Sequence, residues 1–81
     1  MDPVIEIEIL DSLDMGNGRL TPERVICADV RRALSDEITD EVVKDSIKTL
    51  VDVSEIECSN DRDLGKRYRM TALGKLRFNK K

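Results

Sequence analysis

The chain gathers its positive charge near the C-terminus, where lysines and arginines follow one another with almost no acid between them. Residues 62–81 hold eight lysines and arginines and one acid, Asp63, so this segment has a net charge of +7. The whole chain has a net charge of −3, which leaves −10 for residues 1–61. A molecule polarised in this way attracts an anion to its basic end and repels it elsewhere. The alternative is an ordinary solvated surface with a basic tail. The cations of the segment are Arg62, Lys66, Arg67, Arg69, Lys75, Arg77, Lys80 and Lys81.

The other residue types that carry chemistry indicate no catalytic site. The chain has no histidine, no serine beside a possible base at a recognisable spacing, and no glycine-rich phosphate loop of the GxGxxG or GxxxxGK type. Paired carboxylates are frequent, but their spacing is typical of solvated helix faces. The chain is therefore predicted not to be an enzyme and to need no cofactor.

The two cysteines, Cys27 and Cys58, lie far apart in the sequence among apolar neighbours. This favours two buried, reduced thiols over a disulfide or a metal site. A zinc site would have to use carboxylates, because there is neither a histidine nor a third cysteine, and structural zinc sites rarely do so. No metal site is predicted.

Eighty-one residues make one domain, and the spacing of the apolar residues predicts mostly helix. The domain is expected to span residues 1–81, with helices at about 3–15, 22–34, 40–53 and, shorter, 72–78. The second and third helices, joined by a short turn, form a helix-turn-helix. The predicted inward-facing residues are Ile5, Ile9, Leu10 and Leu13; Ile26, Cys27, Val30, Ala33 and Leu34; Val43, Ile47, Leu50 and Val51; and Leu73, Leu76 and Phe78.

Each helix has a start signal. The first has a capping acid, Asp2, followed by proline, and the second has Thr21 as cap with Pro22 at its first position. Thr39 or Asp40 is expected to cap the third helix, and Thr71 the last.

Between the third and last helices the spacing changes to that of strands. Ile56 and Cys58 alternate with polar residues, and so do Tyr68 and Met70, which predicts two strands with one buried face. Residues 59–66 are rich in turn formers and are expected to be a loop. The result is a β-hairpin over about residues 55–70, and the fold class is α+β, mostly α.

The stretch from Leu50 to Leu76 resembles the small winged helix-turn-helix transcriptional regulators of bacteria and archaea. Their hairpin, the wing, typically returns through a "yrLTxxG" strand, which reads here Tyr68-Arg69-Met70-Thr71-Ala72-Leu73-Gly74, with methionine in place of leucine. The LTPE segment at residues 20–23 is similar to the entry of the second helix in these proteins.

This resemblance implies a DNA-binding protein with a transcriptional role. The helix at 40–53 would lie in a major groove of duplex DNA, and the wing, residues 59–67, would touch the flanking backbone or the minor groove. The candidate DNA contacts are Lys44, Lys48 and Thr49 on the helix and Arg62, Lys66, Arg67 and Arg69 on the wing.

The third helix itself is acidic, with a net charge of −2 over residues 40–53. It carries no arginine, asparagine or glutamine for the usual bidentate base contacts, which argues against that form of sequence readout. The alternative function is therefore a winged helix that binds another protein and no DNA.

The expected partners are duplex DNA and a second copy of the chain. A weak apolar strip formed by Val4, Ile7 and Met15 lies opposite the predicted core face of the first helix, so a homodimer would use this helix or the last one. No apolar run approaches the roughly 18 residues of a membrane span, and Asp2 and Pro3 do not suit a secretory leader. No membrane contact is expected, and the predicted location is the cytoplasm.

Overall fold

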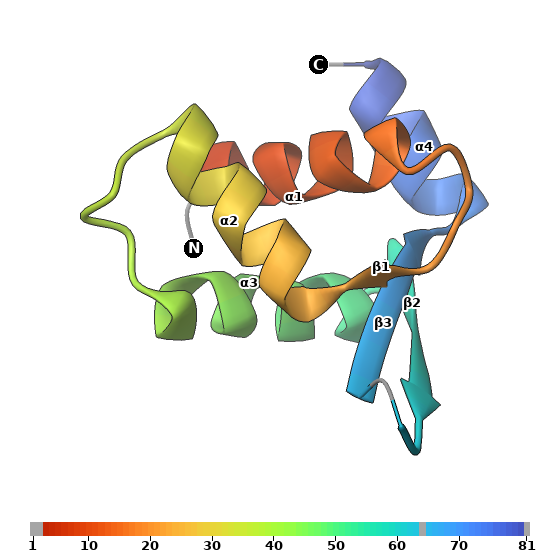
Figure 1. Cartoon of the computed structure of the whole chain (residues 1–81). Coiled ribbons are helices and arrows are strands. Elements are labelled where there is room, and N and C mark those ends of the chain that lie inside the picture. The colour runs from red at the N-terminus through yellow and green to blue at the C-terminus, as the bar shows by residue number, and fades with distance from the viewer. Residues whose placement is uncertain (1–2, 64, 81) are drawn as a thin grey trace.

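The computed structural model describes residues 3–63 and 65–80, and its elements follow the order of a winged helix-turn-helix (Figure 1). The bounds are α1 Pro3–Met15, β1 Thr21–Pro22, α2 Glu23–Ala33, α3 Asp40–Asp52, β2 Ile56–Asp61, β3 Gly65–Met70 and α4 Ala72–Asn79. The predicted fold class is confirmed: helices dominate, and a C-terminal hairpin extends from one end of the helical part. We call this hairpin, β2 and β3 with their connecting turn, the wing.

The core lies between α1, α2 and α3 and is closed by the base of the wing. Burying one large aliphatic side chain contributes about 1.5–3 kcal/mol, so these contacts are the main stabilisation of so small a chain. Of the side chains predicted to face inward, Ala33 is exposed and Leu34 and Val51 are half-buried. Ala33 and Leu34 lie at the C-terminal end of α2, and Val51 lies at the margin of the buried face of α3. The buried apolar residues are Ile5, Ile9, Leu10, Leu13, Ile26, Cys27, Val30, Val43, Ile47, Leu50, Ile56 and Tyr68.

The sheet has the order β1-β3-β2 and is antiparallel throughout. Strands β2 and β3 pair from Ile56 with Met70 to Asp61 with Gly65, so the hairpin has about the predicted span but its strands are longer and its turn is shorter than predicted. The predicted loop at 59–66 is wrong for residues 59–61 and 65–66, which pair in the ladder although none of them has an apolar side chain to bury. The turn itself is stabilised by the Asp61 carboxylate, which accepts a hydrogen bond from the N–H of Asp63 at 2.8 Å. Leu64 lies outside the described residues.

Two of the predicted caps are confirmed and one is wrong. The Thr39 hydroxyl accepts from the N–H of Val42, and the Thr71 hydroxyl accepts from the N–H of Gly74, both at 3.3 Å. Thr21 does not cap α2. Its backbone pairs with Tyr68 in the sheet, and α2 begins two residues later at Glu23 without a side-chain cap. The predicted cap Asp2 lies outside the described residues.

The last helix turns a different face to the core than predicted. Leu73 and Leu76 are 55% and 57% exposed, whereas Phe78 packs partly against the core. Gly74 is the buried residue of α4, and it sits against the carbonyl oxygen of Glu55. The glycine allows the backbone of α4 to approach the start of β2, and this contact directs both leucines outward.

Candidate nucleic-acid interface

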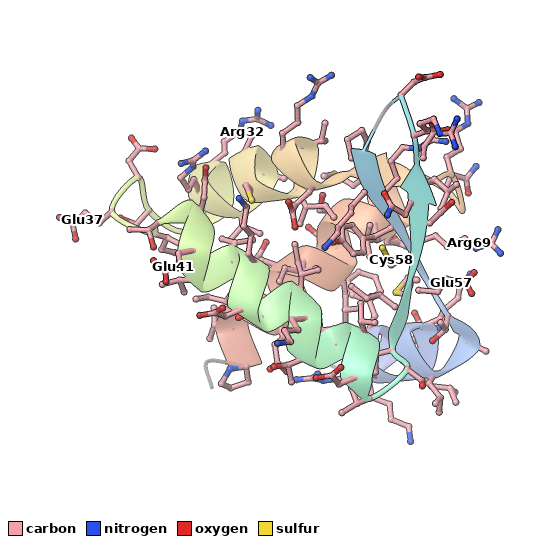
Figure 2. The ribbon with its side chains drawn as sticks, turned by 90° about the horizontal axis from the view of Figure 1, so that it is seen from below. Arg32, Glu37, Glu41, Glu57, Cys58 and Arg69 are labelled. Atoms are coloured by element: carbon pink, nitrogen blue, oxygen red, sulfur yellow. The ribbon has the colours of Figure 1, made fainter. Side chains whose placement is uncertain are left out.

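The two faces of the wing carry different charges. Because successive side chains of a strand point to opposite faces, Lys66 lies on the same face as Tyr68, while Arg67 and Arg69 lie on the other. Residues directly opposite in the ladder share a face, so Cys58 lies on the face of Tyr68 and Glu57 on that of Arg69. The first face turns toward the helices and the second turns away from them. Figure 2 shows Cys58 on the inner side of the hairpin and the pair of Glu57 and Arg69 on its outer side.

A hollow of about 580 Å³ lies between the inner face of the wing and α3. Three lysines line it: Lys44 and Lys48 from α3 and Lys66 from β3. Each of these lysines is exposed, and none takes part in an ion pair within residues 3–63 and 65–80. The structure thus brings together three of the predicted site residues from two segments. The hollow is also lined by Glu23, Asp45, Ile47, Val51, Cys58 and Tyr68.

Tyr68 lines the buried side of the hollow and connects the wing to the helices. This side chain is 4% exposed, and its hydroxyl donates to Oε1 of Glu23 at 3.3 Å. Burial raises the pKa of Tyr68 well above its usual value, and the negative charge of Glu23 and the neighbouring Cys58 raise it further. The bond joins β3 to the first turn of α2 and so fixes the wing relative to the helices.

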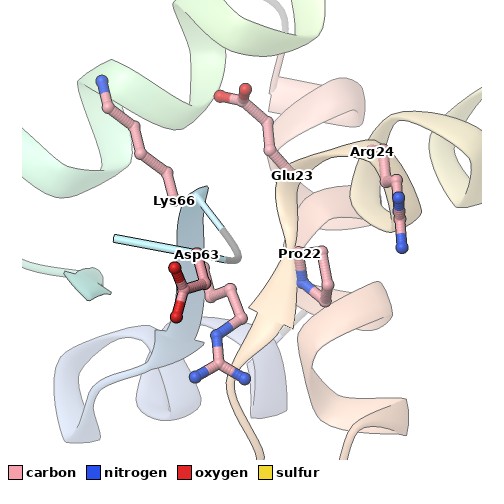
Figure 3. A pocket seen from close by; sticks show the side chains of 6 residues that line it. Pro22, Glu23, Arg24, Asp63 and Lys66 are labelled. Carbon is pink, nitrogen blue, oxygen red and sulfur yellow. The ribbon is translucent and has the colours of Figure 1, made fainter. Parts of the chain in front are cut away.

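A second, smaller hollow of about 380 Å³ lies beside the first, between the start of α2 and the wing (Figure 3). Its cations are Arg24, Arg67 and Lys66, and the Lys66 side chain extends toward α3 in the close-up. The hollow is also lined by Pro22, Glu23 and Asp63. Arg24 is exposed and was not among the predicted site residues. Its position in the first turn of the second helix, next to a strand that pairs with the wing, is a tertiary feature that its sequence neighbours do not reveal.

The outer arginines of the wing are held by carboxylates. Arg69 pairs through Nε with Oε1 of Glu57, directly opposite it in the ladder. Arg67 Nη2 lies 3.7 Å from Oδ2 of Asp61, and the Arg67 side chain is only 26% exposed. These two predicted site residues are therefore engaged within the wing and lie apart from the lysine-lined hollow.

The remaining predicted site residues lie at the margins. Arg62 is exposed at the turn of the wing. Thr49 is half-buried, and its hydroxyl donates to the backbone carbonyl of Asp45 at 3.2 Å. On the helix it lies about 140° from Lys44 and 100° from Lys48, at the edge of α3 away from the hollow.

The cysteines differ from the prediction in one respect. Cys27 is buried, and burial raises the pKa of its thiol, with the charges of Asp40 and Glu23 as further causes. Cys58 is exposed, because the wing extends beyond the core after Ile56. Within the described residues, no group of three or more potential ligands could hold a metal ion. None of the described helices is long and apolar enough to cross a membrane.

The fold and the hairpin define a winged helix-turn-helix, as the resemblance implied. No protein-family model matches the chain, and no curated protein matches it in sequence. Among solved structures it is similar to the crystal structure of a PadR family transcription regulator from hypervirulent Clostridium difficile R20291. The TM-score is 0.74 at 19% identity, over 93% of this chain and 79% of the other. At this identity the similarity establishes the winged-helix fold.

Proposed function

We propose that the chain is a single winged-helix domain that binds duplex DNA and regulates transcription in the cytoplasm. The observation that carries the proposal is the convergence of Lys44, Lys48 and Lys66 on one open hollow beside the exposed face of α3. Ammonium groups on two adjacent elements suit the closely spaced phosphates of a DNA strand. The structural neighbour with the same fold is described as a transcription regulator, which agrees with this function.

In the proposed complex α3 enters the major groove, and the hollow receives the phosphate backbone that borders the groove. Lys44 contacts this backbone from the helix, and Lys66 contacts it from the wing. Lys48 lies nearer the centre of the exposed face of α3 and faces the base edges. Arg62, at the turn of the wing, reaches the flanking backbone or the minor groove. Arg24 adds a contact from the start of α2. Thr49, Arg67 and Arg69 are weaker candidate contacts. The Thr49 hydroxyl donates to a backbone carbonyl, and both arginines form ion pairs within the wing, although Nε of Arg67 has no hydrogen-bond partner in the described part of the chain.

The test is a salt titration of binding to a labelled duplex of mixed sequence, followed by fluorescence anisotropy. Each neutralised phosphate contributes about 0.9 to the slope of log affinity against log salt. The Lys44→Ala/Lys66→Ala variant is expected to lose about two units of slope relative to the wild type. The matched control is Arg19→Ala/Arg32→Ala, which removes two exposed cations that line neither hollow, and it should keep the wild-type slope.

One observation favours the alternative function, a winged helix that binds another protein. The exposed face of α3 carries Glu41, Asp45 and Asp52, which phosphates repel and a basic protein attracts. Absence of binding to any duplex at low salt would support this alternative. A wild-type slope near zero would do the same.

We further propose that the chain forms a homodimer through α1 and α4. Leu73 and Leu76 are exposed, and with Ile7 and Pro3 they line a shallow hollow of about 610 Å³. The α4 side of this surface is basic, with Lys75 and Lys80. A two-fold axis would place α1 of one copy against α4 of the other, so that the apolar side chains of both helices meet. Of the strip predicted for this contact, Val4 and Met15 are exposed and Ile7 is half-buried.

A further inference from the structure

The centre of the exposed face of α3 is formed by charged residues of both signs. With a rotation of 100° per residue, four side chains fall within an arc of roughly 60°. They lie opposite the buried side chains of Val43, Ile47 and Leu50. These four residues are Glu41, Asp45, Lys48 and Asp52. If α3 lies in a major groove, this arc faces the base edges, and Lys44 at its margin faces the backbone.

The central charges are available for contacts with a ligand. Asp45 and Lys48 are three residues apart on the same face, a spacing at which helical ion pairs form. Yet no ion pair within the described ranges uses either side chain, or Glu41 or Asp52. At the start of the same helix, Asp40 pairs with Arg31 at 2.8 Å.

The hydrogen-bonding groups at the base edges determine which bases a carboxylate and a neighbouring ammonium group, such as those of Asp45 and Lys48, can bind. A carboxylate accepts hydrogen bonds only, and the N4 amino group of cytosine offers it a donor with an acceptor on one side only, O6 of the paired guanine. The N6 amino group of adenine lies between two acceptors, its own N7 and O4 of the paired thymine, and both repel a carboxylate. An ammonium group suits O6 and N7 of guanine. An acid and a lysine side by side are thus complementary to a cytosine and a guanine side by side.

We propose that Asp45 and Lys48 read C·G base pairs in the major groove, with Asp45 accepting from cytosine N4 and Lys48 donating to guanine O6 and N7. This inference rests on the proposed DNA binding and gives the acids of α3 a role in it. They lower the affinity for duplexes in general through repulsion of phosphates, and they favour sites where a cytosine amino group compensates for the repulsion. The domain then gains sequence preference without arginine, asparagine or glutamine on its recognition helix.

The test is selection of bound duplexes from a random library with the wild type, with Asp45→Asn and with Asp36→Asn. Asp36 lies in the exposed turn between α2 and α3, so its variant has the same change in charge away from the groove. The wild type and the Asp36 variant should prefer C·G at one position by about five-fold or more, as expected for one base contact. Asparagine suits adenine N6 and N7, so Asp45→Asn should change the preference at that position from cytosine to adenine.

Three results would overturn the inference. If Asp45→Asn binds all duplexes more tightly and keeps the wild-type preference, Asp45 acts only through its charge. If the wild type binds duplexes without any base preference, the inference fails and the proposed DNA binding stands. If the wild type binds no duplex, both fail. Circular dichroism of each variant confirms that the fold is intact, which is expected because both changed positions are exposed.

Discussion

Tyr68 is the residue on which the geometry of the site depends most. It is the only tyrosine of the chain, and it lies at the point where β3, the start of α2 and the hollow meet. Its hydroxyl bond to Glu23 is made by the neutral phenol, so ionisation of the ring would break it and place two negative charges together. The wing is therefore positioned by a group that is uncharged at neutral pH.

The titration of Tyr68 is the first prediction. In the unfolded chain the phenol ionises near its ordinary pKa of 10, and in the folded protein its pKa is raised. The neutral form is favoured by folding, so this contribution to stability is complete below pH 10 and is lost as the pH rises further. The phenolate absorbance should appear together with alkaline unfolding, and the Tyr68→Phe variant should lose stability less steeply above pH 10. A phenol that ionises near pH 10 in folded protein would contradict the buried hydrogen bond.

The second prediction compares two cations of the wing. Lys66 faces the hollow without an ion pair among the described residues, whereas Arg69 faces outward and pairs with Glu57. Lys66→Ala should lower duplex affinity about five-fold at moderate salt and reduce the salt slope by about one unit. Arg69→Ala should change duplex affinity by less than about two-fold, because Arg69 faces away from the hollow and its ion pair with Glu57 is exposed. Titrations of both variants against one duplex check this, and a larger loss for Arg69→Ala would place the contact on the outer face.

At the scale of elements, the junction between α3 and β2 sets the position of the wing relative to the recognition helix. The N–H of Glu55 donates to the carbonyl of Leu50 at 2.9 Å, and the N–H of Ser54 donates to that of Val51 at 3.0 Å. This pair of bonds is the Schellman motif, which requires a left-handed residue after the helix. Ser54 occupies that position with φ of 64°. Glycine is the usual residue at this position. Because serine stands there instead, the sequence carries no glycine signal for the C-terminal end of α3.

Ser54→Gly is therefore expected to stabilise the fold. Glycine removes the steric cost of the left-handed conformation, about 1 kcal/mol, while the bonds to Leu50 and Val51 use only backbone atoms. Urea unfolding followed by circular dichroism measures the gain. A loss of stability would mean that the entropy of glycine in the unfolded chain outweighs the relief of strain.

Gly74→Ala is expected to destabilise the fold. An added Cβ would collide with the carbonyl oxygen of Glu55 and with the side chain of Met70, so α4 would have to move away from the start of β2. Overpacking of this kind costs about 1–3 kcal/mol. Lys75→Ala, at the next, exposed position of the helix, is the control and should leave stability nearly unchanged. Equal unfolding midpoints for the two variants would show that α4 does not pack as described.

The helices, the helix-turn-helix and two threonine caps could be predicted from the sequence, because helical spacing and cap residues are local signals. Which face of the wing turns toward the helices could not be predicted from the sequence. Period-two spacing shows that Arg67 and Arg69 share a face, but the pairing of β3 with β1 decides which face turns to the helices. The exposure of Leu73 and Leu76 could not be predicted either, because the sequence pattern does not distinguish a leucine on a docking surface from a leucine in the core.

For the whole molecule, separation of charge along the sequence does not become separation in space. Arg77 pairs with Glu6 at 2.6 Å and with Glu55 at 2.7 Å, which ties α4 to α1 and to the start of β2. Arg67 and Arg69 are likewise paired with acids from the first 61 residues. The basic segment thus neutralises part of the acidic one, and the lysine-lined hollow combines cations of both segments.

The homodimer gives a prediction at this scale. Leu76 is 57% exposed on the proposed contact surface, so Leu76→Glu should keep the fold and prevent association. Sedimentation equilibrium should give about twice the chain mass of 9.2 kDa for the wild type and the single mass for the variant. Val42→Glu, an exposed position on α3 away from this surface, is the control and should remain dimeric. A wild type that sediments with the single mass would exclude the dimer.

The most direct measurement is chemical-shift mapping of the labelled chain during titration with a short duplex. If DNA lies between α3 and the wing, the largest shifts should occur at Lys44, Lys48 and Lys66 and at Tyr68 beneath them. Shifts along the outer face of the wing should be smaller, and α4 should show none. Shifts confined to α1 and α4, or no shifts at a duplex concentration that saturates other winged helices, would contradict the claim that DNA lies between α3 and the wing.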